Sequence, residues 1–264
     1  MWFERRSFWV AKDAGHPDEY QDAYALSAAR RIAAIADGVS DSIFSGRWAQ
    51  LLTRAVVTDR PDLQDTDGLT EWLAKPRADW QSGIDESQLA WHQKAKLRDG
   101  AFSTLLWVEL AVGTEVGEAG VANSTDGMRL RCYSMGDCLL LVVRDGQLLS
   151  SFPMTSSAAF DTHPASLGSI AGPRDRQLRF EEIETGCQSG DLLVLCTDAV
   201  GAWALACYEA GSPPDWENYW EMDEPTWLAE IIEHRVAGKM RYDDTTLLML
   251  RIGGNEIASA ESSE

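Results

Sequence analysis

The stretch IAAIADGVSDS, Ile32–Ser42, joins an apolar run to two carboxylates. Its first five residues are apolar or small, which is typical of a buried β-strand. The run ends at Asp37-Gly38, and a second acid, Asp41, follows four residues after Asp37. Aspartate is common in the turns that end strands. The stretch alone is therefore compatible with an ordinary turn or with a carboxylate that faces a functional site.

Apolar runs of strand length recur along the whole chain. They occupy residues 7–11, 22–27, 31–36, 102–112, 128–135, 138–143, 191–196 and 245–252. The Asp145-Gly146 pair, in VVRDGQLLS, predicts a hairpin turn between two strands.

Helical spacing is found in three segments, namely residues 42–57, 85–100 and 224–239. Ser40, Asp41 and Ser42 are candidate N-caps of the first helix, and we therefore assign Asp41 to a cap rather than to a site. In the third helix, Leu228, Ile231 and Ile232 are expected to share the buried face.

The order of elements predicts an α+β fold. Strands, two helices, many strands, a helix and a last strand follow one another, which is not the regular alternation of a parallel α/β sheet. Antiparallel sheets covered by helices fit this order better. No repeat or linker divides the chain, so residues 1–252 are expected to form a single domain, followed by a flexible tail over residues 253–264.

The composition excludes several classes of protein. With 42 acidic and 23 basic residues the net charge is −19, which disfavours nucleic acid and anionic membrane as partners. No apolar run is long enough to span a bilayer, and the N-terminus lacks the core of a secretory signal. The five cysteines form no C-x-x-C pair, and several lie in apolar runs, as reduced core thiols do. We expect a soluble, cytoplasmic monomer.

Five strand-like runs adjoin aspartates, which are Asp22, Asp37, Asp137, Asp198 and the Asp243-Asp244 pair. Each by itself is better explained as a turn residue. Together they suggest more, because strand ends meet at the rim of a sheet and several carboxylates there repel one another unless a cation neutralises them. Oxygen ligands favour hard cations such as Mg²⁺ or Mn²⁺.

Six motifs now carry a resemblance to a known family. YQDAY, AIADGVS, GAFSTLLWV, YSMGDCLLLVVRDGQL, GDLLVLCTDAVGAW and MRYDDTTLLMLRI follow one another from residue 20 to residue 252, and the match as a whole begins at about residue 8. In this order they resemble the motifs of the metal-dependent PP2C-type (PPM) protein serine/threonine phosphatases, and the bacterial members most. The resemblance implies a four-layer α-β-β-α sandwich of two antiparallel sheets flanked by helices.

The resemblance also implies a reaction and a set of ligands. In the family, two Mg²⁺ or Mn²⁺ ions share a water that attacks phosphoserine or phosphothreonine, and several members hold a third ion. The positions in this chain that match metal ligands are Asp22, Asp37, Gly38 through its carbonyl, Asp198, Asp243 and, for the third, weaker metal, Asp137. Asp37 and Asp198 would serve catalysis through the metal-bound water. Asp244 is expected to hold the metal ligands in position without binding a metal itself.

Three departures from the family pattern concern the chemistry. Pro17 occupies the position of a phosphate-binding arginine, so that His16 or Lys12 becomes the candidate for phosphate binding. Val39 replaces the histidine thought to act as general acid in animal enzymes, which leaves His16 or metal-bound water for that role. Ala199 replaces a glycine, which requires a negative φ at that residue.

Other signals are weaker. Cys138 to Arg144 has the Cys-x5-Arg spacing of tyrosine phosphatases, but the residues between them are Leu and Val, which favours a strand. Trp216 and Trp220, in an acidic segment expected to be a surface excursion, are candidates for a partner site or for local packing.

Three functions therefore stay open. The first is a phosphoprotein phosphatase that opposes a bacterial Ser/Thr kinase, as the resemblance implies. The second is a catalytically silent relative that binds a phosphoprotein or a kinase partner, suggested by the missing arginine and histidine. The third is a phosphatase of small phosphate esters, which would share the same site.

Overall fold

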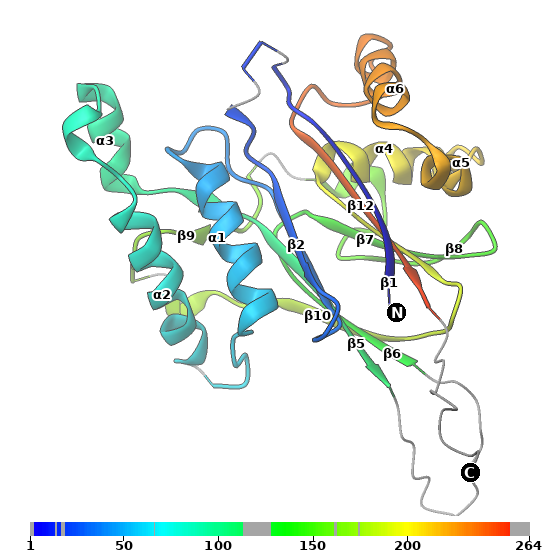
Figure 1. Ribbon diagram of the computed structural model, residues 1–264, viewed down its shortest axis with the longest axis horizontal. Helices are drawn as coiled ribbons and strands as arrows, with labels where there is room; N and C mark the ends of the chain where they lie inside the picture. Colours follow the sequence, from blue (N-terminus) through cyan, green and yellow to red (C-terminus); the bar gives the residue numbers. More distant parts are fainter. Residues whose placement is uncertain are drawn as a thin grey trace, which may run out of the picture.

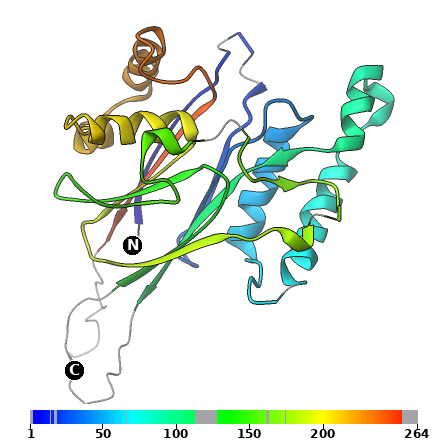
Figure 2. The same cartoon turned by 180° about the vertical axis from the view of Figure 1, so that it is seen from behind.

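The computed structural model is a four-layer α-β-β-α sandwich, which confirms the predicted fold class (Figures 1 and 2). It describes residues 3–13, 15–16, 19–65, 67–112, 128–160, 163–173 and 175–253. All but the first residue of the predicted flexible tail, residues 254–264, lies outside the described part of the chain.

Two five-stranded antiparallel sheets form the inner layers. The first has the order β1-β12-β11-β7-β8, with β1 Phe3–Val10, β12 Thr245–Ile252, β11 Leu192–Cys196, β7 Leu139–Arg144 and β8 Gln147–Phe152. The second has the order β10-β6-β5-β3-β2, with β10 Glu181–Cys187, β6 Met128–Met135, β5 Leu105–Val112, β3 Ile32–Ala36 and β2 Ala23–Ser27. The short strands β4 Phe102–Ser103 and β9 Leu167–Gly168 pair separately. The first and last described strands, β1 and β12, pair with each other at one edge of the first sheet.

Helices cover the outer face of each sheet (Figure 1). On one side lie α1 Ser45–Thr58, α2 Gly68–Ser82 and α3 Trp91–Asp99, and α1 packs on β2, β3 and β5. On the other side lie α4 Asp198–Glu209, α5 Trp216–Glu221 and α6 Glu224–Val236, of which α4 contacts β12 and α6 contacts β1. Three single 3-10 turns, η2 Glu86–Gln88, η3 Ser157–Ala159 and η4 Asp175–Gln177, complete the described elements.

Three separate hydrophobic cores fill the spaces between the four layers, and β3 shows why its sequence has no alternation. Ile32, Ala34 and Ala36 face the helical layer, whereas Ala33 and Ile35 face the other sheet. Because both faces are covered, every residue of β3 is buried. A continuous apolar run is the expected pattern for such a strand.

The first predicted helix is confirmed, but its cap is not where the sequence suggested. The N-cap of α1 is Phe44, with φ 54°, and no side chain caps this end. The Ser42 hydroxyl instead donates a hydrogen bond to the Val39 carbonyl and accepts one from the Phe102 N–H. The prediction that Asp41 caps α1 is therefore wrong, because its carboxylate is not used for capping.

Three helices were not predicted. In α2, Pro76 lies inside the helix, where proline usually ends one. In α4, residues Asp198 to Gly201 are all buried, so the apolar pattern shows no clear face. The short α5 buries Trp216 and Trp220 in the core outside the first sheet, and this burial overturns the partner-site hypothesis for both.

Helix α6 buries a different face from the predicted one. Trp227 and Ile231 are buried, but Leu228 and Ile232 are 43% and 48% exposed. The reason is that the inner face is set by the large Trp227 ring, which stacks on Phe8 of β1 at a centroid distance of 5.3 Å. Of the expected apolar trio, only Ile231 lies on the same side as this tryptophan.

Other local predictions hold. Asp145 and Gly146 have φ values of 49° and 75° and form the tight turn between β7 and β8. The segment after Cys138 is the buried strand β7, so it cannot be a phosphate-binding loop.

All five cysteines are free, and four of them are buried. In the described part of the chain, no helix has both the length and the apolar character needed to cross a membrane.

Candidate active site

Four of the aspartates singled out in the sequence line one cavity of about 290 Å³: Asp37, Asp137, Asp198 and Asp243. They come from separate connections, after β3, between β6 and β7, after β11 and before β12. The strands of each sheet pair antiparallel, and the two sheets pack face to face. These strand ends therefore meet at the same rim. Gly38 and Asp41 also line this space, which we call the carboxylate cavity.

Asp37 is held in place through its backbone. Its N–H donates to Thr104 Oγ1 at 2.9 Å, and its carbonyl accepts the Thr104 N–H and the Ser103 hydroxyl, both at 2.8 Å. Its carboxylate therefore projects from a rigid strand end. Burial raises the pKa of Asp37 well above its usual value, and the nearby carboxylates, Asp22 foremost, raise it further.

Gly38 is required by close packing rather than by an unusual φ. A Cβ at this position would lie 2.7 Å from the carbonyl oxygen of Gln21 and 2.8 Å from the backbone carbon of Ser45. The β3 end, the chain before β2 and the start of α1 meet here. A residue with a side chain would separate them.

Asp22 is not among the residues that line the carboxylate cavity; it is only 2% exposed, and its charge acts on the neighbouring Asp37. Its Oδ2 accepts hydrogen bonds from Thr197 Oγ1 at 3.0 Å and Thr246 Oγ1 at 2.7 Å. Its Oδ1 is buried without a hydrogen-bond partner among the described residues. Burial, with a smaller contribution from Asp244, raises the pKa of Asp22 to about 8, although the threonine hydrogen bonds act in the opposite direction.

Asp198 is the first residue of α4. Its Oδ2 accepts a hydrogen bond from Arg241 Nη1 at 3.1 Å, and its Oδ1 is buried without a partner in the described structure. Burial and then Asp243 raise the pKa of Asp198, while Arg241 lowers it. Ala199 is the next residue of α4 and is not among the described residues with positive φ. The negative φ that its β-carbon requires is therefore present.

The adjacent acids Asp243 and Asp244 have different environments. Asp243 lines the cavity, and its side chain lies 3.5 Å from Lys12 Nζ. Asp244 is buried, and its two oxygens accept the backbone N–H groups of Lys12 and Gln21 at 2.7 and 2.8 Å. Asp244 thus fastens the chain between β1 and β2 to the start of β12, which agrees with the supporting role expected for it.

The structure adds residues that the sequence did not indicate. Asp41, Thr104, His163 and Arg241 line the carboxylate cavity. The position of Asp41 four residues after Asp37, and of Arg241 two before Asp243, was a usable signal, whereas nothing marked His163. His16 pairs with Asp13 at 2.8 Å and lines a neighbouring groove, not the carboxylate cavity.

The donor atoms suit a hard cation, although the described residues do not form a finished site. No three acidic, histidine or cysteine side chains of the described ranges are close enough together to hold a metal as they stand. However, two buried carboxylate oxygens, on Asp22 and Asp198, lack any partner in that part of the chain. Burial and then repulsion by the neighbouring aspartates raise the pKa of Asp37. Unpaired carboxylate oxygens in a repulsive cluster are what an oxygen-seeking cation neutralises.

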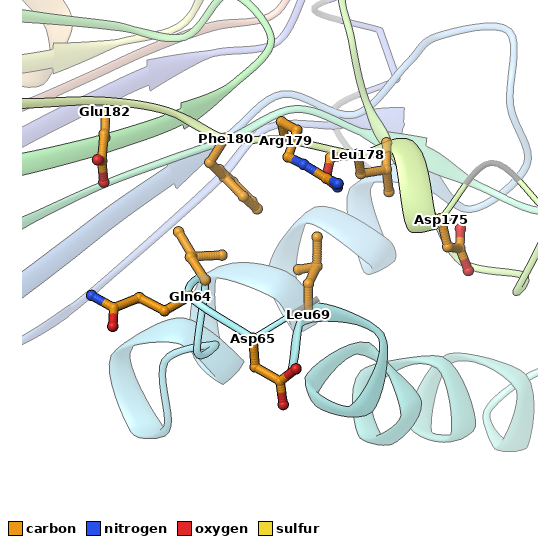
Figure 3. Close-up of a pocket in the computed structure, with 9 residues that line it drawn as sticks. Gln64, Asp65, Leu69, Asp175, Leu178, Arg179, Phe180 and Glu182 are labelled. Carbon is orange, nitrogen blue, oxygen red and sulfur yellow. The ribbon is translucent and has the colours of Figure 1, made fainter. Parts of the chain in front are cut away.

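A second cavity, of about 280 Å³, has a different character (Figure 3). It lies between the residues that lead into α2 and the segment that leads into β10, and Leu69, Leu178 and Phe180 contribute to its walls. The carboxylate of Asp175 there is already paired with Arg77 at 2.7 Å. This cavity offers no comparable set of acids.

Comparison with known proteins supports the fold through structure alone. No family model and no curated protein matches the sequence. Among solved structures, the chain is similar to PppA, a key regulatory component of T6SS in Pseudomonas aeruginosa, with 17% identity, a TM-score of 0.55 and coverage of 96% of this chain and 98% of that one.

Two further solved structures agree. The photosystem II phosphatase PBCP has 15% identity, a TM-score of 0.54 and coverage of 95% and 98% of the two chains. The catalytic domain of the serine/threonine phosphatase PstP, in complex with two manganese ions, has 16% identity, a TM-score of 0.52 and coverage of 96% and 99%. The chain therefore has the fold of the PP2C-type (PPM) serine/threonine phosphatases over nearly its whole length.

Proposed function

We propose that this chain is a metal-dependent protein phosphatase of the PP2C type that hydrolyses phosphoserine or phosphothreonine on proteins. The observation that carries the proposal is the gathering of Asp37, Asp137, Asp198 and Asp243 around one cavity, with the buried Asp22 close enough for its charge to act on Asp37. The physiological setting that we propose is the cytoplasm, opposite a Ser/Thr kinase.

The residues that would hold two Mg²⁺ or Mn²⁺ ions are Asp22, Asp37, Gly38 through its carbonyl, Asp198 and Asp243, with Asp137 available for a third ion. Such ions would supply an activated water and neutralise charge on the transferring phosphoryl group. The part of Thr104 and Ser103 is to fix the Asp37 backbone. The buried threonines Thr197 and Thr246 hold the Asp22 carboxylate in place through its Oδ2 and leave Oδ1 without a hydrogen bond among the described residues.

Arg241 is the candidate for binding the phosphate in place of the arginine that Pro17 replaces. It is the only lysine or arginine among the described residues that line the carboxylate cavity. It donates to Asp198 and to the Phe160 carbonyl, and a guanidinium has further N–H groups for an anion. His163, in the same lining, is the candidate for the role of proton donor that Val39 cannot fill.

Arg241→Ala is expected to raise the KM for a phosphopeptide about tenfold or more, because a charge-assisted hydrogen bond to phosphate is lost. Arg241→Lys should recover part of this loss. The control is Arg98→Ala, which removes the same charge from exposed α3. Steady-state kinetics at saturating Mn²⁺ make the measurement, and an unchanged KM in Arg241→Ala would contradict the assignment.

The proposed function is tested by phosphate release from phosphoserine and phosphothreonine peptides with Mn²⁺, with Mg²⁺ and with EDTA. We expect turnover only with a metal. Release from p-nitrophenyl phosphate but not from peptides would instead favour a phosphatase of small esters. No release from any substrate under any metal would reject the enzyme.

A silent regulator is the second candidate, favoured by Val39 and Pro17 and by the absence of a finished metal cluster among the described residues. Titration calorimetry with Mn²⁺, run beside the turnover assay, separates the two functions. Metal binding without turnover supports the regulator, and metal binding with turnover supports the phosphatase.

A further inference from the structure

Asp243 differs from Asp37 and Asp198, with which it lines the carboxylate cavity, in how its backbone is supported. Asp37 follows β3 directly and Asp198 is the first residue of α4, whereas Asp243 lies in the irregular connection between α6 and β12. Its side chain is 40% exposed, so packing does little to hold it. The position of its carboxylate therefore depends on the contacts that fix this connection.

Arg235, near the end of α6, binds this connection from the outer helical layer. Its Nη2 donates hydrogen bonds to the Asp243 carbonyl and to Thr245 Oγ1, the latter at 2.7 Å. Thr245 Oγ1 in turn donates to the same carbonyl at 3.1 Å. The guanidinium also lies over the ring of Tyr242, 5.4 Å from its centroid. The Asp243 backbone is thus held by two donors, and the charged one forms the stronger kind of hydrogen bond.

The same guanidinium binds the end of strand β1. Its Nη1 donates to the Ala11 carbonyl at 3.1 Å, and its Nη2 donates to the Val10 carbonyl at 3.5 Å. The next residue is Lys12, whose Nζ lies 3.5 Å from the Asp243 carboxylate. In Figure 1, α6 lies at the upper end of the molecule, beside the chain that leads into β12. One side chain of the outer layer therefore ties together the two segments that meet at Asp243.

The hydrogen bonds of Arg235 go to the backbone and to a hydroxyl, and no carboxylate of the described residues pairs with it. The residue is half-buried, and burial lowers the pKa of its guanidinium, whereas the nearby Asp244 and Asp243 act in the opposite direction. Burying a charge costs free energy unless hydrogen bonds compensate for it. Here the compensation comes from carbonyls of two separate segments, so the contacts of this arginine join those segments.

We propose that Arg235 is a positioning residue of the candidate active site, which sets where the Asp243 carboxylate stands by fixing its backbone against the end of β1. This inference rests on the proposed phosphatase function, in which Asp243 would be a metal ligand. Arg235 is not among the residues that line the carboxylate cavity, so it acts through Asp243 and not on a metal or a substrate. A guanidinium suits this task because its planar fork of donors reaches several carbonyls at once.

Two substitutions at Arg235 and one matched control make the test. Arg235→Met removes all the donors, and Arg235→Lys keeps the charge on a compact ammonium that cannot reach both segments equally well. The control is Arg251→Met at the other end of β12. Arg251 ties this strand to α5 by donating to Glu217 at 2.6 Å and by lying over the Trp220 ring at 4.3 Å. Thermal unfolding without metal verifies that each variant is folded at the temperature of the titrations.

Titration calorimetry with Mn²⁺ measures the predicted effect without any need for turnover. We expect Arg235→Met to weaken Mn²⁺ binding about tenfold or more, because changes to residues that orient metal ligands typically cost 10- to 100-fold in affinity. Arg235→Lys should recover part of this loss. Arg251→Met should bind Mn²⁺ as wild type does, even if its unfolding midpoint is lower.

A double-mutant cycle with Asp243→Asn tests whether Arg235 acts through Asp243. Asp243→Asn should weaken Mn²⁺ binding by itself, and adding Arg235→Met to it should then change the affinity little. A general loosening of the fold would instead cost the same in both backgrounds. Stabilisation of the folded state by millimolar Mn²⁺ extends the measurement to weak binding. Additive effects would overturn the proposal, as would wild-type affinity for Mn²⁺ in Arg235→Met.

Failure of the proposed function has a different signature. If wild type binds Mn²⁺ and Arg235→Met weakens this binding, but wild type releases no phosphate from phosphopeptides, the positioning role stands and the enzyme is rejected. If wild type releases phosphate and Arg235→Met binds Mn²⁺ as wild type does, the enzyme stands and the positioning role is rejected. Absence of Mn²⁺ binding in wild type would reject both.

Discussion

Asp37→Asn is expected to lower metal-dependent phosphopeptide hydrolysis by at least about a hundredfold, since even residues that only support metal ligands cost 10- to 100-fold when changed. Asp37 is the residue on which the carboxylate cavity depends most. Its backbone is fixed by Thr104 and Ser103, and four other aspartates act on its charge. Asparagine keeps the shape and removes the charge.

The same substitution is expected to raise the thermal unfolding midpoint of the metal-free protein. No described hydrogen-bond donor contacts the Asp37 carboxylate, and the four charges that act on it most strongly are those of aspartates. Removing one member of a repulsive cluster relieves that repulsion, and about 1 kcal/mol gained corresponds to about 2–4 °C for a chain of this length. Stabilisation by added Mn²⁺ should shrink or vanish in the variant, because a ligand that binds only the folded state stabilises it in proportion to its affinity.

The control is Asp99→Asn, which changes an exposed acid at the end of α3 and should affect neither activity nor the response to Mn²⁺. Activity and unfolding measured with and without Mn²⁺ decide the result. Full activity in Asp37→Asn would remove the carboxylate cavity as the active site. A lower metal-free midpoint would show that the carboxylate stabilises the fold and is not held there against repulsion.

Gly38→Ala is expected to lower the unfolding midpoint by about 6–12 °C and to abolish activity. The added Cβ would lie 2.7 Å and 2.8 Å from backbone atoms of Gln21 and Ser45, neither of which can move by a side-chain rotation. Overpacking of this kind costs about 3 kcal/mol at the upper end of its usual range, which for a chain of this length gives the stated shift. The added Cβ would push apart the three segments that meet at Gly38. One of these segments carries Asp37, so activity is lost together with stability.

Gly186→Ala is the matched control for this prediction. A Cβ at Gly186 of β10 meets no atom within 4 Å, so its midpoint and activity should stay close to those of wild type. Thermal unfolding followed by circular dichroism, with a parallel activity assay, makes the comparison. Equal midpoints for Gly38→Ala and wild type would show that the segments around Gly38 have room that the structure does not contain.

The strands were predictable from the sequence because their signals are local. Strands β3, β7, β11 and β12 are covered on both faces by other layers, and full burial leaves an uninterrupted apolar run. The Asp145-Gly146 turn needs two residues with positive φ, which few residue pairs supply as readily. The helices were less predictable, since Pro76 and the nearly continuous burial at the start of α4 conceal the usual helical pattern.

The sequence by itself determined the apolar runs, the turn and the aspartates at the strand ends, because each depends on neighbours within a few residues. Only the tertiary structure decided that Asp41 and Arg241 share the carboxylate cavity and that Asp22 lies buried close to Asp37. It also decided that Lys12 and Lys96 donate hydrogen bonds to the adjacent residues Ser40 and Asp41. These groups are distant in sequence, and they meet because of the order of the strands within each sheet and the packing of the two sheets against each other.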